Sequence, residues 1–186
     1  MPLNHTSKYS ELTEAQYAAI GKAVVEWANV EFLLGVLLSR LLATPEFLAR
    51  TYTDSISAAR LQEAIVEAVD IHRARYGHRL VSKQVLLEVI QVSSRVTTLR
   101  STRNKIAHFC WTRTHDEELF GTSFRGGVPS SKKERHDHAV LTSQELGSLN
   151  NEAYALVEQL MKLVEKIPEV TEESLLTLPL SGHSKG

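Results

Sequence analysis

The sequence has a single cysteine and almost no net charge. One cysteine, Cys110, permits no disulfide within the chain, which fits a reducing compartment. A formal net charge of −1 excludes a protein that is basic overall, so any contact with a nucleic acid must come from a local patch. Hydrophobic residues make up 42% and charged residues 23% of the chain, which is too ordinary a composition for general disorder.

The sequence also lacks a long apolar run. The longest, Phe32 to Leu38, is too short to cross a bilayer. The first ten residues show no apolar run after a basic start, so we expect neither a membrane span nor a secretion signal, and a cytoplasmic protein. The length of 186 residues fits one domain with a full core. We expect a polar arm over residues 1–12, a helical domain over 13–167 and a tail over 168–186.

Apolar residues recur at steps of three and four through most of the chain, which predicts helices. Thr13 with Gln16, and Thr142 with Glu145, have the spacing of capping boxes and mark the starts of the first and the last long helix. The predicted fold is all-α, a bundle of four to five helices. Its helices cover residues 13–42, 45–52, 57–76, 82–108 and 142–167.

The second half of the first predicted helix is apolar nearly all round. Such a helix is buried centrally or covered by a partner chain, and we expect a homodimer. Glu31 stands on the apolar stripe, where a carboxylate is costly unless it is paired. Two interpretations remain open. Glu31 either pairs with Arg103 or Arg100 and orients it, or lies at the bundle edge and reaches water.

The pattern changes between the last two long helices. Residues 109–114 and 119–124 are rich in aromatic and β-branched residues and predict a short β-hairpin. Residues 125–139 contain adjacent glycines, Pro129 and a charged run, which predicts a loop. We do not expect His136 and His138 in that loop to hold a metal ion. A hairpin-and-loop insertion over 109–140 therefore precedes the last helix.

The end of the fourth predicted helix is a concentrated basic patch. No Asp or Glu occurs from Val89 to His115, while five cations do. Compensation of the helix dipole explains one or two of them in the last turn, but not all five. We expect Arg100, Lys105 and Arg113 to contact RNA phosphates. The five cations are Arg95, Arg100, Arg103, Lys105 and Arg113.

The spacing of this patch suits acid–base chemistry on a phosphate. Arg100, Asn104 and His108 are four residues apart and share one helix face, and Arg103 lies about 100° round the helix from Asn104. An unperturbed imidazole titrates at about pH 6.5 and can move a proton, while a guanidinium binds phosphate through paired hydrogen bonds. Attack by an RNA 2′-hydroxyl on its own phosphate needs these two functions and neither a metal nor a cofactor.

The string Arg103-Asn104-x-x-x-His108 near the end of a long helix resembles the R-x4–6-H motif of the HEPN superfamily. The resemblance extends loosely over residues 12–167 and implies a four- or five-helix bundle. It also implies a homodimer whose two motifs face one cleft.

The resemblance further implies a metal-independent endoribonuclease that leaves a 2′,3′-cyclic phosphate, as toxins and phage-defence effectors do. It implies an antitoxin or regulatory protein as partner. On this resemblance His108 is the general acid or base, Arg103 stabilises phosphate charge and Asn104 orients substrate or histidine. The insertion over 109–140 departs from a minimal member of the family.

Two other functions stay open. Other members of the family have lost catalysis or bind nucleotides. In a non-catalytic module, the same patch would bind a nucleotide or an RNA backbone, or would serve as a protein contact. In a purely structural helical dimer, His108 would be an ordinary helix-terminal cation.

Other residues with reactive side chains are expected to be structural. We expect His72 and His78 on the surface and Cys110 as a small buried hydrophobe. We expect Trp111 to pack against the bundle rather than stack on a base.

Overall fold

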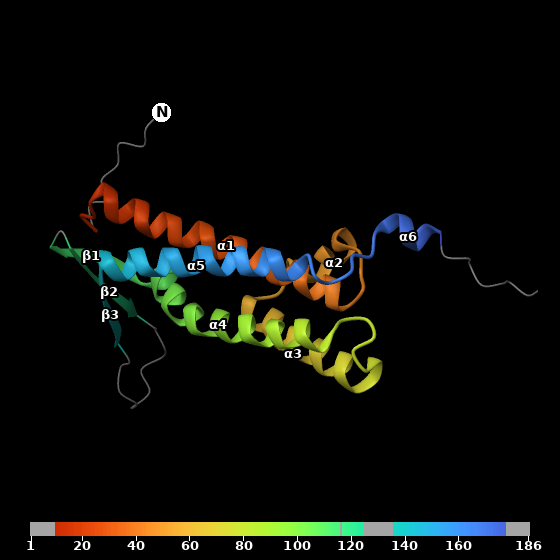
Figure 1. The fold of residues 1–186 in the computed structure, drawn as a ribbon. Helices are drawn as coiled ribbons and strands as arrows, with labels where there is room; N and C mark the ends of the chain where they lie inside the picture. The colour runs from red at the N-terminus through yellow and green to blue at the C-terminus, as the bar shows by residue number, and fades with distance from the viewer. Residues whose placement is uncertain (1–9, 116, 125–135, 178–186) are drawn as a thin grey trace, which may run out of the picture. The chain divides into compact units, whose positions relative to one another are not determined.

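Helices dominate the computed structural model, which describes residues 10–115, 117–124 and 136–177 (Figure 1). The predominantly helical fold is confirmed, with a small antiparallel sheet added. None of the helices in these described ranges has the length and apolar composition that a bilayer span requires. The elements are α1 (Glu14–Leu41), α2 (Glu46–Thr53), α3 (Ala58–Ile71), a π-helical turn (His72–Tyr76), α4 (Lys83–His108), β1 (Cys110–His115), β2 (Glu118–Phe124), β3 (His136–Thr142), α5 (Ser143–Val164) and α6 (Glu172–Leu176).

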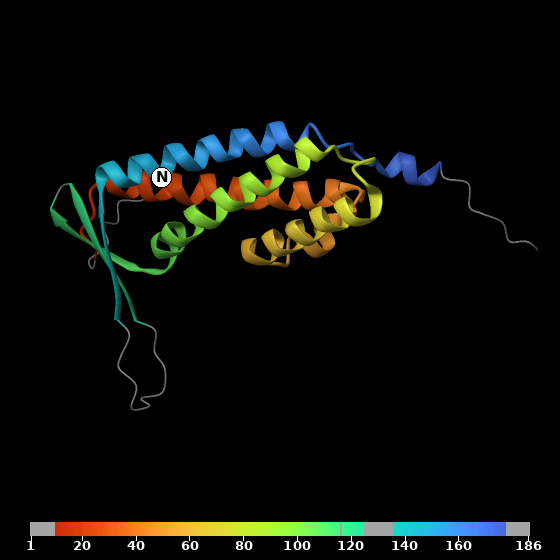
Figure 2. The ribbon, with the colours of Figure 1, turned by 60° about the horizontal axis from the view of Figure 1, so that its bottom comes forward.

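The chain divides into two compact units. The first comprises residues 1–30 and 94–157, and the second comprises residues 31–93 and 158–186. The first unit therefore contains the beginning of α1, the end of α4, the sheet and most of α5. In it, the first halves of α1 and α5 run side by side (Figures 1 and 2), and the amide nitrogen of Asn150 donates to the carbonyl of Ala19 at 3.1 Å.

Both predicted capping boxes are confirmed. The N–H of Thr13 donates to Gln16 Oε1 at 2.9 Å, and the N–H of Gln16 donates to Thr13 Oγ1 at 3.2 Å. At the start of α5, Glu145 Oε2 accepts the backbone N–H of Thr142 at 2.8 Å and its hydroxyl at 2.9 Å. These two bonds, the backbone one first, hold the pKa of Glu145 below its ordinary value. Backbone N–H groups at the start of each of these helices, which have no acceptor within the helix, are thus hydrogen-bonded to side chains.

The sheet has the strand order β1-β2-β3, with both neighbouring pairs antiparallel. Side chains alternate between its two faces, and the inner face packs against the helices of the first unit. Trp111 on β1, Leu119 on β2 and Leu141 on β3 are buried there. The shared core consists of Leu12, Ala23, Ile106, Trp111, Leu119, Ala139, Leu141 and Leu146.

The third strand was not predicted, since residues 136–139 fell in the expected loop. The insertion is a three-stranded sheet rather than a hairpin followed by loop up to α5. The run of charges before Ala139 concealed the strand, because only Ala139 and Leu141 supply the apolar alternation. Pairing with β2 supplies what the local pattern lacks: Ala139 faces Gly121, and Leu141 faces Leu119.

Trp111 fixes the sheet to the end of α4. Its side chain is 8% exposed, and its indole Nε1–H donates to the carbonyl oxygen of Ile106 at 3.1 Å. A Cβ on Gly121, the facing residue of β2, would lie 2.6 Å from Trp111 Cζ3, so the indole occupies the space that a side chain there would need. The expectation that Trp111 packs against the bundle is confirmed.

In the second unit, the expectation of a surface position is wrong for His72. This side chain is 3% exposed, and its Nε2 is hydrogen-bonded to the carbonyl oxygen of Leu41 at 2.8 Å. The reason is visible in the spacing, because His72 continues the buried stripe of α3 through Leu61, Ile65 and Ala68 in steps of four and three. His78, after the π-helical turn, is half-buried.

Candidate nucleic-acid interface at the end of helix α4

The last turns of α4 present polar side chains because one apolar residue anchors them. Ile106 is 4% exposed and belongs to the core of the first unit. Asn104 and His108 lie two residues before and after it, about 160° round the helix, and both are exposed. Burial of Ile106 therefore turns the predicted Asn104 and His108 face towards solvent.

Arg103 is half-buried and held from two sides. Its guanidinium carbon lies 5.5 Å from the ring centroid of Trp27, which is 2% exposed, in a cation–π contact. Its Nη1 also donates to Asn104 Oδ1 at 3.2 Å. The structure thus brings Arg103 and Asn104 together. No sequence pattern indicates that an indole lies under this guanidinium, because Trp27 is only one position on an apolar stripe.

His108 is the last residue of α4, and its side chain is exposed. The backbone N–H of Phe109 still donates to the carbonyl of Lys105 at 2.9 Å, so His108 keeps helical geometry. It therefore stands one turn beyond Asn104 on the same face, where residues four apart have Cβ atoms about 6 Å apart. An imidazole, an amide and a guanidinium thus occupy neighbouring positions along one helix end.

The predicted phosphate contacts lie on both elements of this region. Arg100 is half-buried on α4, one turn before Asn104, and Lys105 is exposed. Arg113 is exposed on β1, and its backbone N–H donates to the carbonyl of Ser10 at 3.1 Å. This end of the first unit therefore carries cations on the helix and on the strand that follows it.

Glu31 belongs to the second unit. Its side chain is half-buried and lines a groove of ≈ 260 Å³ together with Phe32, Thr53 and Asp54. The expected pairing of Glu31 with Arg103 or Arg100 would join the two units, and it stays a prediction.

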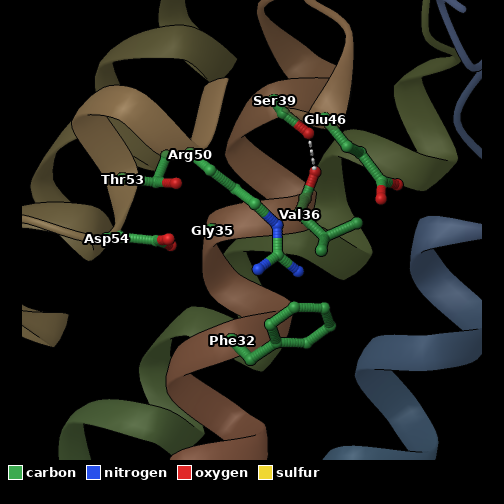
Figure 3. Close-up of a pocket in the computed structure, with 8 residues that line it drawn as sticks. All are labelled: Phe32, Gly35, Val36, Ser39, Glu46, Arg50, Thr53 and Asp54. Atoms are coloured by element: carbon green, nitrogen blue, oxygen red, sulfur yellow. Dashed lines mark hydrogen bonds between the residues drawn. The ribbon is translucent and has the colours of Figure 1, made fainter. Parts of the chain in front are cut away.

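A smaller pocket in the second unit lies between α1 and α2 (Figure 3). The guanidinium of Arg50 lies over the ring of Phe32, 4.6 Å from its centroid, and Ser39 Oγ donates to the carbonyl of Val36 at 2.7 Å. The pocket volume of ≈ 10 Å³ is room for one water molecule. It is therefore too small for a nucleotide or a metabolite.

Cys110 is exposed, so the expectation of a small buried hydrophobe is wrong. The reason is strand alternation: β1 directs Trp111 inward, and its neighbour Cys110 must then point outward. The strand predicted over 109–114 was the signal for this outward position, because neighbouring residues of a strand face opposite sides.

No three His, Cys, Asp or Glu side chains lie close enough together to share a metal ion within residues 10–115, 117–124 and 136–177. Comparison with protein-family models, with curated proteins and with solved structures finds no match to this chain. The residues at the end of α4 are therefore the basis for inferring a function.

Proposed function

We propose that the protein is a metal-independent endoribonuclease of the HEPN type, with Arg103, Asn104 and His108 as its catalytic residues. The observation that carries this proposal is the held guanidinium of Arg103. It lies over buried Trp27 and beside Asn104, one to two turns from the exposed imidazole of His108. A cation held by its neighbours, close to a group that can move a proton, is the arrangement that phosphate transesterification uses.

The residues divide the chemistry between them. The RNA 2′-hydroxyl oxygen attacks the adjacent phosphorus, and the bond from phosphorus to the 5′-oxygen breaks. The 2′-hydroxyl loses its proton and the departing 5′-oxygen gains one, and His108 serves as the base or the acid in this exchange. Arg103 stabilises the charge on the phosphorane oxygens. Since Asn104 Oδ1 accepts from Arg103, its Nδ2 hydrogens remain to donate to a phosphate oxygen.

The proposed substrate chemistry is tested with the purified chain and a single-stranded RNA oligonucleotide. We expect products with a 2′,3′-cyclic phosphate and a 5′-hydroxyl, formed at the same rate with and without EDTA. The matched control is the same oligonucleotide with 2′-O-methyl groups throughout, which has no nucleophile and should stay intact. Loss of activity in EDTA, or cleavage of the methylated strand, would contradict the proposal. Salt-dependent RNA binding with no cleavage at any protein concentration would favour the alternative, a non-catalytic nucleotide-, RNA- or protein-binding module.

We further propose a homodimer formed along the first half of α1. This segment leaves Tyr17, Val24 and Val25 exposed, at 39%, 45% and 59%, and the space beside Gly21 is open. Tyr17, Gly21, Val24 and Ala28 follow steps of four and three, the spacing of a helix–helix seam. An isologous pair through this stripe would bury the apolar surface.

Sedimentation at micromolar concentration should therefore give twice the chain mass. Val24→Lys on the stripe should shift the protein to a monomer, because it places a charge in the seam. Asn29→Lys adds the same charge at an exposed position about 140° round the helix and should leave the dimer intact. A parent chain that sediments as a monomer would remove the shared cleft that the family resemblance implies. An antitoxin or regulatory partner, which the resemblance also implies, remains part of the proposal.

A further inference from the structure

The outer face of the β-sheet is a surface that the proposed catalytic residues do not use. Because Trp111, Leu119 and Leu141 point inward, their neighbours along each strand point outward. The register aligns these outward residues in rows across the three strands. One row is Cys110, Thr122 and His138, and the next is Thr112, Phe120 and Val140.

Two flat rings lie together on this face. The rings of Phe120 and His138 stack, with centroids 6.4 Å apart and planes at 21°. His138 is exposed and Phe120 is half-buried, so solvent reaches the pair. Exposed aromatic rings on a sheet are the platforms on which unpaired nucleic-acid bases stack, since every base offers a π-face.

The surroundings of the rings favour a base over an apolar protein segment. Val140 is the one aliphatic side chain in these two rows. Its neighbours Thr112, Thr122 and Cys110 supply hydroxyls and a thiol, which suit the polar edges of a base. A protein partner docking by apolar burial would need more aliphatic surface than this.

The face is also continuous with the end of α4. Its first row begins at Cys110, two residues after His108, and the bond from Trp111 to the carbonyl of Ile106 fixes strand and helix to each other. Glu118 lies in the row furthest from Cys110. Its carboxylate accepts from Thr114 Oγ1 at 2.9 Å and lies 3.8 Å from His115 Nε2. A polyanion that approaches from the α4 end therefore meets the rings before this carboxylate.

We propose that the outer face of the sheet binds a base of single-stranded RNA, stacked on Phe120 and His138. The phosphate chain then continues towards Arg103 and His108. The ligand class rests on the proposed function, whereas the surface itself follows from the register of the sheet. Single strands are preferred to duplexes, because the faces of paired bases are covered by their neighbours in the helix.

The first test measures binding to the His108→Ala chain, in which the RNA stays intact. Phe120→Ala should weaken binding of a single-stranded oligonucleotide about tenfold, and Phe120→Tyr should restore it because the ring is kept. Tyr154→Ala removes an exposed ring from α5 of the same unit rather than from the sheet, so it is the matched control and should bind as the parent does. Unchanged affinity in Phe120→Ala, with an unchanged unfolding temperature, would overturn the proposal.

The second test uses Cys110, the single cysteine, as a reporter in the first row. Saturating single-stranded RNA should slow its reaction with a maleimide several-fold, and a duplex of the same sequence should not. Protection without any cleavage by the parent chain would support this surface while the proposed enzyme function fails. Cleavage with an unprotected thiol would support the enzyme and overturn the stacking surface. If no RNA binds, both proposals fail.

Discussion

Replacing His108 with alanine is expected to lower the rate of RNA cleavage by about 10²- to 10⁴-fold, the usual contribution of a general acid or base. The fold should persist, because His108 is exposed at the last residue of α4 and no core contact depends on it. The measurement is the single-turnover cleavage rate, with the unfolding temperature recorded on the same preparation.

His115→Ala is the matched control for this prediction. His115 is also an exposed histidine of the first unit, on β1, and its side chain is 61% exposed. Removing it should leave cleavage within about twofold of the parent rate, because an exposed substitution away from the site changes little. Cleavage that continues undiminished in His108→Ala would end the assignment of His108 as the proton carrier.

Replacing Gly121 with valine is expected to lower the free energy of unfolding by about 3 kcal/mol, the upper part of the range for an overpacked core. The added Cβ would lie 2.6 to 2.8 Å from three carbon atoms of the Trp111 indole. The indole cannot swing away cheaply, because it is buried and its Nε1–H is bonded to the carbonyl of Ile106. Urea titration followed by circular dichroism measures the change.

The matched control is Gly147→Ala, on α5 of the same unit. A Cβ at Gly147 meets no atom within 4 Å, and alanine in a helix is favoured over glycine by about 0.5 to 1 kcal/mol. The control should therefore stabilise the chain. A Gly121→Val chain as stable as the parent would show that the indole does not fix the sheet as described.

Features that depend on neighbours in sequence could be predicted closely. The capping boxes at Thr13 and Thr142 place the starts of α1 and α5 correctly, because their hydrogen bonds span only three residues. The third strand could not be predicted in the same way. Its residues acquire strand geometry through pairing with β2, which brings Ala139 opposite Gly121. Such pairing leaves little trace in a short local pattern.

The candidate site likewise combines features that depend on sequence neighbours with features that depend on distant parts of the chain. Helical spacing alone places Asn104 and His108 on one face, and the burial of Ile106 agrees with that face being outward. The indole of Trp27 beneath Arg103 comes from another helix, and no spacing rule relates the two. The outer face of the sheet could not be predicted either, because the sequence pattern predicts a loop at His138 and a hairpin at Phe120.

The two tryptophans have a practical consequence, because both lie in the first unit. Trp27 supports the guanidinium of Arg103, and Trp111 joins the sheet to α4, while residues 31–93 and 158–186 contain no tryptophan. Intrinsic tryptophan fluorescence of the unlabelled chain therefore originates entirely in the half that carries the candidate site. Quenching or a spectral shift of the tryptophan emission on addition of a ligand would report on that half alone, because the other half has no tryptophan.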